Sequence, residues 1–155
     1  MTRTVRDIID SIRKYHLALA ERYVELAGNP SQPEKVVKVI LYLRDREHYQ
    51  AYTLEQELER SDYSNILNTW VKEGPDEPSE QLKMDVSEQL PNQQYSTETL
   101  ASACSTQHHS IENVYEQLLQ TRHSESAKDY FNSLLVSENT ELRNKMNMLS
   151  ESELL

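Results

Sequence analysis

The chain has 155 residues, enough for one domain with a hydrophobic core. Sixteen basic residues against 26 acidic ones give a formal net charge of −10, which disfavours binding to nucleic acids and to anionic membranes. Two glycines and five prolines are few for this length, so we expect long helices rather than a β fold with many turns.

Cysteine usage and hydropathy restrict the class of protein further. Cys104 is the only cysteine, so an intrachain disulfide is impossible and nothing indicates an oxidising compartment. No stretch approaches the roughly 18 consecutive apolar residues of a transmembrane helix, and the first residues lack the apolar core of a signal peptide. We therefore expect a cytoplasmic protein that neither enters a membrane nor binds nucleic acid.

The first half of the chain predicts two antiparallel helices, over about residues 4–28 and 33–61. Thr4 and Asp7 have the spacing of a capping box at the start of the first helix. Apolar residues then recur in alternating steps of four and three, which places them on one helix face, and His16 interrupts this row near its middle. The row is Val5, Ile9, Ile12, His16, Leu19, Tyr23 and Leu26.

The second predicted helix carries Asp45 and His48 at positions where an apolar row should continue. That row is Val37, Leu41, Asp45, His48 and Tyr52. Residues three apart lie on one helix face, and a carboxylate and an imidazole facing inward are costly unless hydrogen-bonded, ion-paired or bound to a metal. A further helical segment extends this prediction to about residue 72, through Trp70 and Val71.

A long connection over about residues 73–96, containing three prolines, separates the two halves. Its length suggests that it crosses from one end of a bundle to the other, so that the third helix runs parallel to the second. The third and fourth helices are predicted over about residues 97–122 and 126–149. The expected fold is all-α: a four-helix bundle in a single domain, residues 1–155, with one long crossover between helices 2 and 3.

The second half of the chain repeats the plan of the first. His108 interrupts the row of the third helix and is followed by a tyrosine seven residues later, as His16 is in the first helix. Glu138 and Glu141 interrupt the row of the fourth helix, at the same three-residue spacing as the polar pair of the second. This internal similarity suggests two helical hairpins built to one plan.

Inward-facing positions near the middle of four packed helices converge on one level of a bundle. The polar side chains at this level would form a cluster of imidazoles and carboxylates suited to iron, manganese or zinc. The predicted metal ligands are His16, Asp45, His48, His108, Glu138 and Glu141.

This arrangement resembles the rubrerythrin-type di-iron proteins of the ferritin-like family, in which two helices each supply one Glu and two supply Glu-x-x-His. The resemblance covers roughly Val5 to Met148 and implies a metal-binding bundle, either an oxidoreductase or a metal-handling protein. His16 and His108 stand where the family has its single glutamates, and Glu141 replaces a histidine. Because fewer carboxylates would neutralise two ferric ions, a single divalent ion or a modified dinuclear site fits better.

A metal-free interpretation of the same residues stays open. A histidine in an apolar row is often a hydrogen-bonded core residue, and Asp45 and Glu138 could pair with basic side chains in a satisfied polar network. The row could also be offset, which would turn Glu47 and either Glu112 or Glu116 inward.

Under the metal-free hypothesis, the protein would be a helical module for protein interaction or assembly. Trp70, Val71 and the crossover would then supply the apolar contact surface. A homodimer through one face of the bundle is compatible with both hypotheses. The sequence contains no Gly-rich phosphate loop, no Cys-x-x-Cys and no nucleophile elbow, so it indicates no catalytic residues of those kinds.

Overall fold

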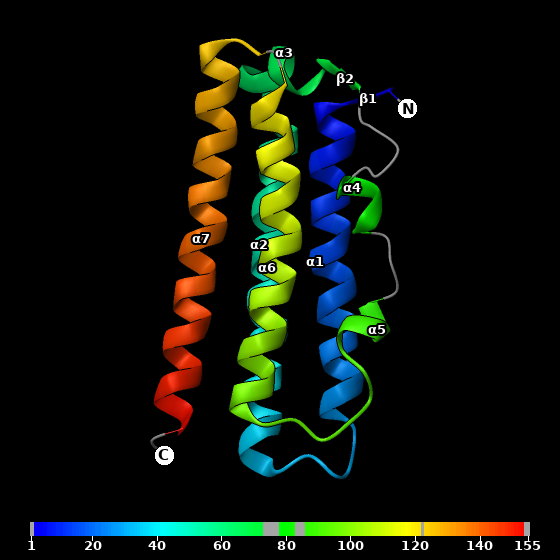
Figure 1. Ribbon diagram of the computed structural model, residues 1–155, viewed down its shortest axis with the longest axis vertical. Helices are drawn as coiled ribbons and strands as arrows, with labels where there is room; N and C mark the ends of the chain where they lie inside the picture. Colours follow the sequence, from blue (N-terminus) through cyan, green and yellow to red (C-terminus); the bar gives the residue numbers. More distant parts are fainter. Residues whose placement is uncertain (1, 73–77, 83–85, 122, 154–155) are drawn as a thin grey trace.

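A computed structural model describes residues 2–72, 78–82, 86–121 and 123–153, and the chain is predominantly helical. Four long helices lie side by side (Figure 1). They are α1 (Val5–Ala27), α2 (Glu34–Glu59), α6 (Thr97–Gln120) and α7 (Glu125–Glu153). The predicted helical character is confirmed, although the predicted end of the third helix at residue 122 lies outside the described residues.

Side-chain caps set the starts of three of these helices. The Thr4 hydroxyl accepts the Asp7 backbone N–H while the Asp7 carboxylate accepts that of Thr4, as the sequence predicts. Ser96 and Thr99 make the same reciprocal pair at the start of α6. α7 begins one residue earlier than predicted, because the Ser124 hydroxyl accepts a backbone N–H of its first turn.

The connections determine the directions of the long helices. α1 and α2 run antiparallel, and so do α6 and α7 (Figure 1). The connection from α2 to α6 returns along α1, and its short helices α4 (Pro78–Gln81) and α5 (Val86–Gln89) both contact α1. Parts of the predicted crossover, residues 73–77 and 83–85, lie outside the described residues. Because of this return, α6 runs in the same direction as α2 (Figure 1).

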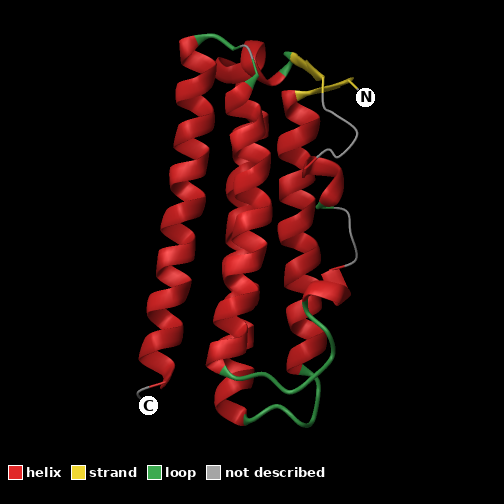
Figure 2. Cartoon of the chain, in the orientation of Figure 1, coloured by secondary structure: helices red, strands yellow, loops and turns green. Residues whose placement is uncertain are grey.

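The segment after α2 differs from the prediction of a helix to about residue 72. It contains the 3-10 turn η1 (Ser61–Tyr63), the short helix α3 (Ser64–Leu67) and the strand β2 (Trp70–Lys72). β2 pairs antiparallel with β1 (Thr2–Thr4), at the end of the molecule where α1 begins (Figure 2). The helical prediction is therefore wrong for the last residues, because their hydrogen-bond partners lie about seventy positions away, where helical periodicity gives no information.

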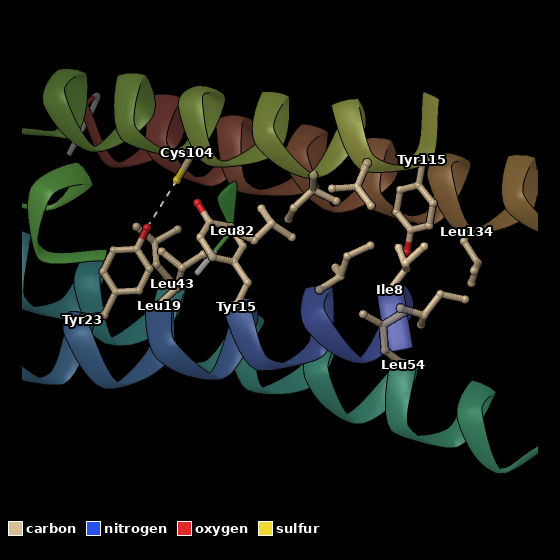
Figure 3. Packing of buried hydrophobic residues seen from close by; sticks show 14 of the residues in the cluster. Ile8, Tyr15, Leu19, Tyr23, Leu43, Leu54, Leu82, Cys104, Tyr115 and Leu134 are labelled. Atoms are coloured by element: carbon tan, nitrogen blue, oxygen red, sulfur yellow. Dashed lines mark hydrogen bonds between the residues drawn. The ribbon is translucent and has the colours of Figure 1, made fainter. Parts of the chain in front are cut away.

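The long helices and the connection enclose one hydrophobic cluster. All seven positions of the row predicted for α1 are buried, which confirms its alternating spacing. Tyr23, Tyr115 and Phe131 are the largest fully buried side chains. Figure 3 shows the hydroxyl of Tyr23 directed at the sulfur of Cys104 on α6, 3.9 Å away. Burial of a large apolar side chain contributes about 1.5–3 kcal/mol, so the apolar members of the row help to hold α1 in place.

Several polar side chains fasten the connection to the first hairpin, and those of Arg22 and Gln32 bond to its backbone. Arg22 of α1 donates from Nε to the Leu90 carbonyl at 2.8 Å. Gln32, in the loop between α1 and α2, donates from Nε2 to the Gln93 carbonyl at 2.7 Å and accepts the Tyr95 backbone N–H at 2.9 Å. Because Gln32 is buried, these bonds replace water that the connection's backbone would otherwise need.

Replacing Gln32 with Ala should lower the free energy of unfolding by about 1–3 kcal/mol, because it leaves the backbone N–H of the buried Tyr95 without its partner. Urea denaturation followed by circular dichroism measures the change. Gln94→Ala, at an exposed position between the two residues that Gln32 contacts, should change stability by less than about 0.5 kcal/mol. A Gln32→Ala protein as stable as the wild type would contradict the assigned role.

Candidate functional site

The side chains predicted to share one level of the bundle do not all face its interior. His16, Glu138 and Glu141 are buried. Asp45 and His48 are exposed, with 64% of the Asp45 side chain accessible and its carboxylate bonded to the neighbouring Arg44. The predicted inward orientation of Asp45 and His48 is therefore wrong.

The reason is the register of α2. Its buried positions are Val36, Val39, Ile40, Leu43, Glu47, Gln50, Ala51 and Leu54. A polar pair three residues apart does face inward, but it is Glu47 and Gln50, shifted by two residues from the predicted pair. The first half of α2 is apolar on nearly every side. Its sequence therefore does not specify which face is buried, and packing against α1 determines that face. The offset alternative is right for Glu47, whereas Glu112 is half-buried and Glu116 is exposed.

Five buried side chains from α1, α2 and α7 form a closed ring, which we call the polar ring. His16 bridges two carboxylates: Nδ1 lies 2.5 Å from Glu47 Oε2, and Nε2 lies 3.1 Å from Glu138 Oε1. Lys145 Nζ donates to Glu47 Oε1 and to Gln50 Oε1, both at 2.7 Å. Gln50 Nε2 donates to Glu138 Oε2 at 2.7 Å and closes the ring. All four carboxylate oxygens of Glu47 and Glu138 are therefore paired within the protein.

The geometry of the polar ring requires His16 to be doubly protonated. A neutral imidazole has one N–H and one lone pair, whereas both ring nitrogens of His16 face carboxylate oxygens. Burial disfavours the charged ring, but the negative charges of Glu138 and Glu47 outweigh burial and raise the pKa of His16 to about 9. His16 is therefore positively charged at neutral pH.

The charges of the polar ring balance one another. Burial alone would raise the pKa of Glu47, but Lys145 and His16 outweigh it and lower that pKa to about 2. Burial likewise opposes the charge of Lys145, yet the neighbouring Glu47 holds the pKa of the ammonium above its usual value. Two carboxylates thus face one imidazolium and one ammonium, so the polar ring carries no net charge.

Two predicted ligands lie outside the polar ring. The Glu141 carboxylate accepts two hydrogen bonds from the guanidinium of Arg46, one from Nε at 3.0 Å. His108 is half-buried, and its Nε2 lies 3.7 Å from a carboxylate oxygen of Glu112 on the same helix. Of the predicted ligands, the structure brings only His16 and Glu138 into direct contact.

α6 contributes a buried amide beside the polar ring. Gln107 accepts the Tyr23 hydroxyl at Oε1, at 3.2 Å, and its Nε2 has no hydrogen-bond partner among the described residues. The space between Gln107, His108 and the polar ring measures about 10 Å³, the room needed by a single water molecule. Cys104 borders this space, and burial raises the pKa of its thiol to about 11, so the nucleophilic thiolate is scarce at neutral pH.

Comparison with known proteins leaves the family of this chain open. No protein-family model, no curated protein and no solved structure matches the chain. Within the part of the chain that the structure describes, no three His, Cys, Asp or Glu side chains come together so that they could hold a metal ion. No helix in the same residues combines the length and apolar character needed to cross a bilayer. The assignment of function therefore depends on the polar ring and on the surface.

Three members of the site were not predicted as functional residues. Lys145 offers a signal in the sequence, because it falls in the inward row of the fourth helix, seven residues after Glu138, where a buried carboxylate needs a counter-ion. Gln50 and Gln107 offer no such signal in the sequence, because glutamine is common on exposed helix faces.

Lys145→Met should destabilise the protein by about 3–5 kcal/mol, because Glu47 would stay buried without its ammonium partner. In a Glu47→Gln background, the same substitution should cost clearly less, because no carboxylate is then stranded. Urea denaturation of the four proteins gives the coupling free energy. Lys14→Met, at an exposed position, is the control for loss of a lysine. If the losses of stability in the two single variants simply add up in the double variant, the pairing of Lys145 with Glu47 is contradicted.

The charge of His16 makes stability depend on pH. The pKa of His16 is about 9 in the folded protein and about 6.5 in an unfolded chain. The contribution of His16 to the free energy of unfolding is therefore complete below about pH 6.5 and is lost as the pH rises through 9. Between pH 6 and 9, the free energy of unfolding of the wild type should fall by on the order of 3 kcal/mol more than that of His16→Gln. Urea denaturation at each pH measures this, and equal slopes would contradict a charged His16.

Proposed function

We propose that this protein is a metal-free four-helix bundle on the ferritin-like plan, with a long crossover, and that it acts as a protein interaction or assembly module. The observation that carries the proposal is the polar ring, in which protein side chains satisfy every oxygen of two buried carboxylates. The directions of the long helices and the connection that returns along α1 support the ferritin-like plan (Figure 1).

Lys145 and His16 supply the positive charge that a metal ion would otherwise supply. Buried carboxylates require a counter-ion, and they obtain it from a metal or from basic side chains. In the polar ring, the ammonium contacts Glu47 and the imidazolium contacts both Glu47 and Glu138. Because the charge is already balanced, binding a divalent cation would leave the interior with excess positive charge.

The donor atoms of the polar ring also fit a transition metal poorly. A histidine ligand must be neutral and must offer a lone pair, whereas both nitrogens of His16 are engaged with carboxylates. Gln50 and Gln107 contribute neutral amides to this region, where a transition-metal site of the di-iron type would need carboxylates or imidazoles. Metal binding would thus require His16 to lose a proton and Lys145 to leave its place.

Two spaces that border the polar ring offer no room for a substrate. The space beside the polar ring is about 10 Å³, and a second one between Tyr49 and Leu134 is about 20 Å³. Sites for small molecules usually measure about 300–1,000 Å³. The small size of these two spaces favours a role at the surface of the protein.

Large apolar side chains are exposed on that surface. Tyr49 and Tyr52 of α2, Trp70 of β2 and Val136 of α7 are each more than half exposed. The contact surface expected from the sequence is correct in placing Trp70 outside, but wrong for Val71, which is buried against the core. Because Tyr and Trp are enriched in protein interfaces, their exposure supports an interaction role.

Protein purified without a histidine tag, from medium containing iron, manganese and zinc, should carry far less than one metal ion per chain. Adding each metal should leave its melting temperature unchanged, because a ligand that binds the folded state would raise it. Elemental analysis and differential scanning calorimetry measure these two outcomes.

The opposite result has a specific signature. A stoichiometric metal that disappears in both Glu47→Gln and Glu138→Gln would overturn the metal-free proposal. Glu112→Gln, which changes a carboxylate outside the polar ring, is the matched control. Loss of metal in this variant as well would indicate adventitious surface binding rather than a core site.

A further inference from the structure

One outward face of α2 carries side chains spaced alternately three and four residues apart. This α2 stripe consists of Lys35, Lys38, Tyr42, Asp45, Tyr49, Tyr52, Gln56 and Glu59. Tyr42 is half-buried and the others are exposed. The stripe lies on the side of the helix opposite to buried positions such as Leu43 and Glu47. The same alternation forms the contact seam of coiled coils, so the stripe has the geometry of a helix-pairing surface.

The chemistry of the α2 stripe changes along its length. Lys35 and Lys38 lie near the N-terminus, three tyrosines occupy the middle, and Glu59 is the last residue of the helix. The helix dipole favours the reverse arrangement, with acidic residues first and basic residues last. Among the described residues, Lys38 lies 3.9 Å from Glu34 of the same helix, whereas neither Lys35 nor Glu59 forms an ion pair.

We propose that α2 pairs antiparallel with α2 of a second copy of this chain, about a two-fold axis near position 47. This pairing deepens the interaction role proposed above, and rests on it, by naming the partner. It sets Lys35 opposite Glu59, Lys38 opposite Gln56, Tyr42 opposite Tyr52 and Asp45 opposite Tyr49. Each contact occurs twice, as an isologous interface requires.

The charge distribution selects this direction of pairing. Antiparallel pairing brings the basic end of each α2 stripe to the acidic end of the other, whereas parallel pairing would set Lys35 against Lys35 and Glu59 against Glu59. In the middle, each Tyr49 hydroxyl comes within reach of the Asp45 carboxylate of the second copy, and neutral aromatic rings meet one another. Lys35 and Glu59 thus come opposite a charge of the other sign only in the antiparallel arrangement.

A hollow beside the α2 stripe supports the same register. It measures about 640 Å³ and lies between the N-terminal half of α2 and the C-terminal end of α7, with Val39, Tyr42 and Met148 among its lining residues. Antiparallel pairing places Tyr52 of the second copy opposite Tyr42, at this hollow. A tyrosine ring covering an apolar floor, with its hydroxyl kept at the polar rim, is a usual anchor of protein interfaces.

Analytical ultracentrifugation of the full chain tests the pairing. The wild type should sediment as a dimer at micromolar concentration. Tyr52→Ala should raise the dissociation constant about tenfold or more, because two anchors are lost per dimer. Lys35→Glu and Glu59→Lys should each weaken the dimer when alone, since each then sets like charges opposite one another.

Mixing Lys35→Glu with Glu59→Lys should restore dimerisation, because the mixed pair regains opposite charges at both ends. Lys14→Glu on α1 makes the same charge change away from the α2 stripe and should leave the dissociation constant unchanged. These positions are exposed, and circular dichroism shows whether each variant is folded. A wild type that stays monomeric at about 100 μM, or charge-reversed variants that dimerise as tightly as the wild type, would overturn the pairing.

The two proposals fail in different ways. A metal-free monomer would overturn the α2 pairing and leave the metal-free bundle intact. A dimer that carries a stoichiometric core metal would overturn the metal-free proposal and leave the pairing intact.

Discussion

The contact on which the rest of the interior depends is the bridge that His16 makes between Glu47 and Glu138. Each carboxylate would be costly to bury by itself, and so would the imidazolium. The two carboxylates raise the pKa of the histidine, and Lys145 together with His16 lowers that of Glu47, so the charged forms persist inside the protein. The charge of Lys145 then completes the balance.

The polar ring also fixes how the helices lie along one another. Its members come from α1, α2 and α7, and every contact between them is short. Moving one helix by a turn, about 5.4 Å, would break several of these contacts and strand a buried charge. An apolar row alone tolerates such shifts more easily, because one aliphatic side chain can replace another in a core. The polar ring therefore adds specificity of register to the stability that apolar burial provides.

The polar ring and the exposed face of α2 both support a role in protein interaction. In the polar ring, both carboxylates are already paired and the adjoining space is about 10 Å³, whereas α2 presents aromatic rings and charged end residues to solvent. The residues predicted to bind metal on this helix, Asp45 and His48, belong to that outer surface. The sequence predicted that Asp45 binds a metal. In the proposed pairing, Asp45 instead contacts a second copy of the chain.

By itself, the sequence determined the long helices, the buried row of α1 and the central position of His16, because local spacing and capping residues encode each of them. It also placed Glu138 inside. Only the tertiary structure decided which face of α2 turns inward, because the first half of that helix is apolar almost all round and Asp45-x-x-His48 and Glu47-x-x-Gln50 share one spacing. The pairing of Trp70–Lys72 with Thr2–Thr4, and of Lys145 with Glu47, joins residues far apart in the chain. Such contacts depend on where the packed helices place each side chain, and local sequence patterns do not encode these positions.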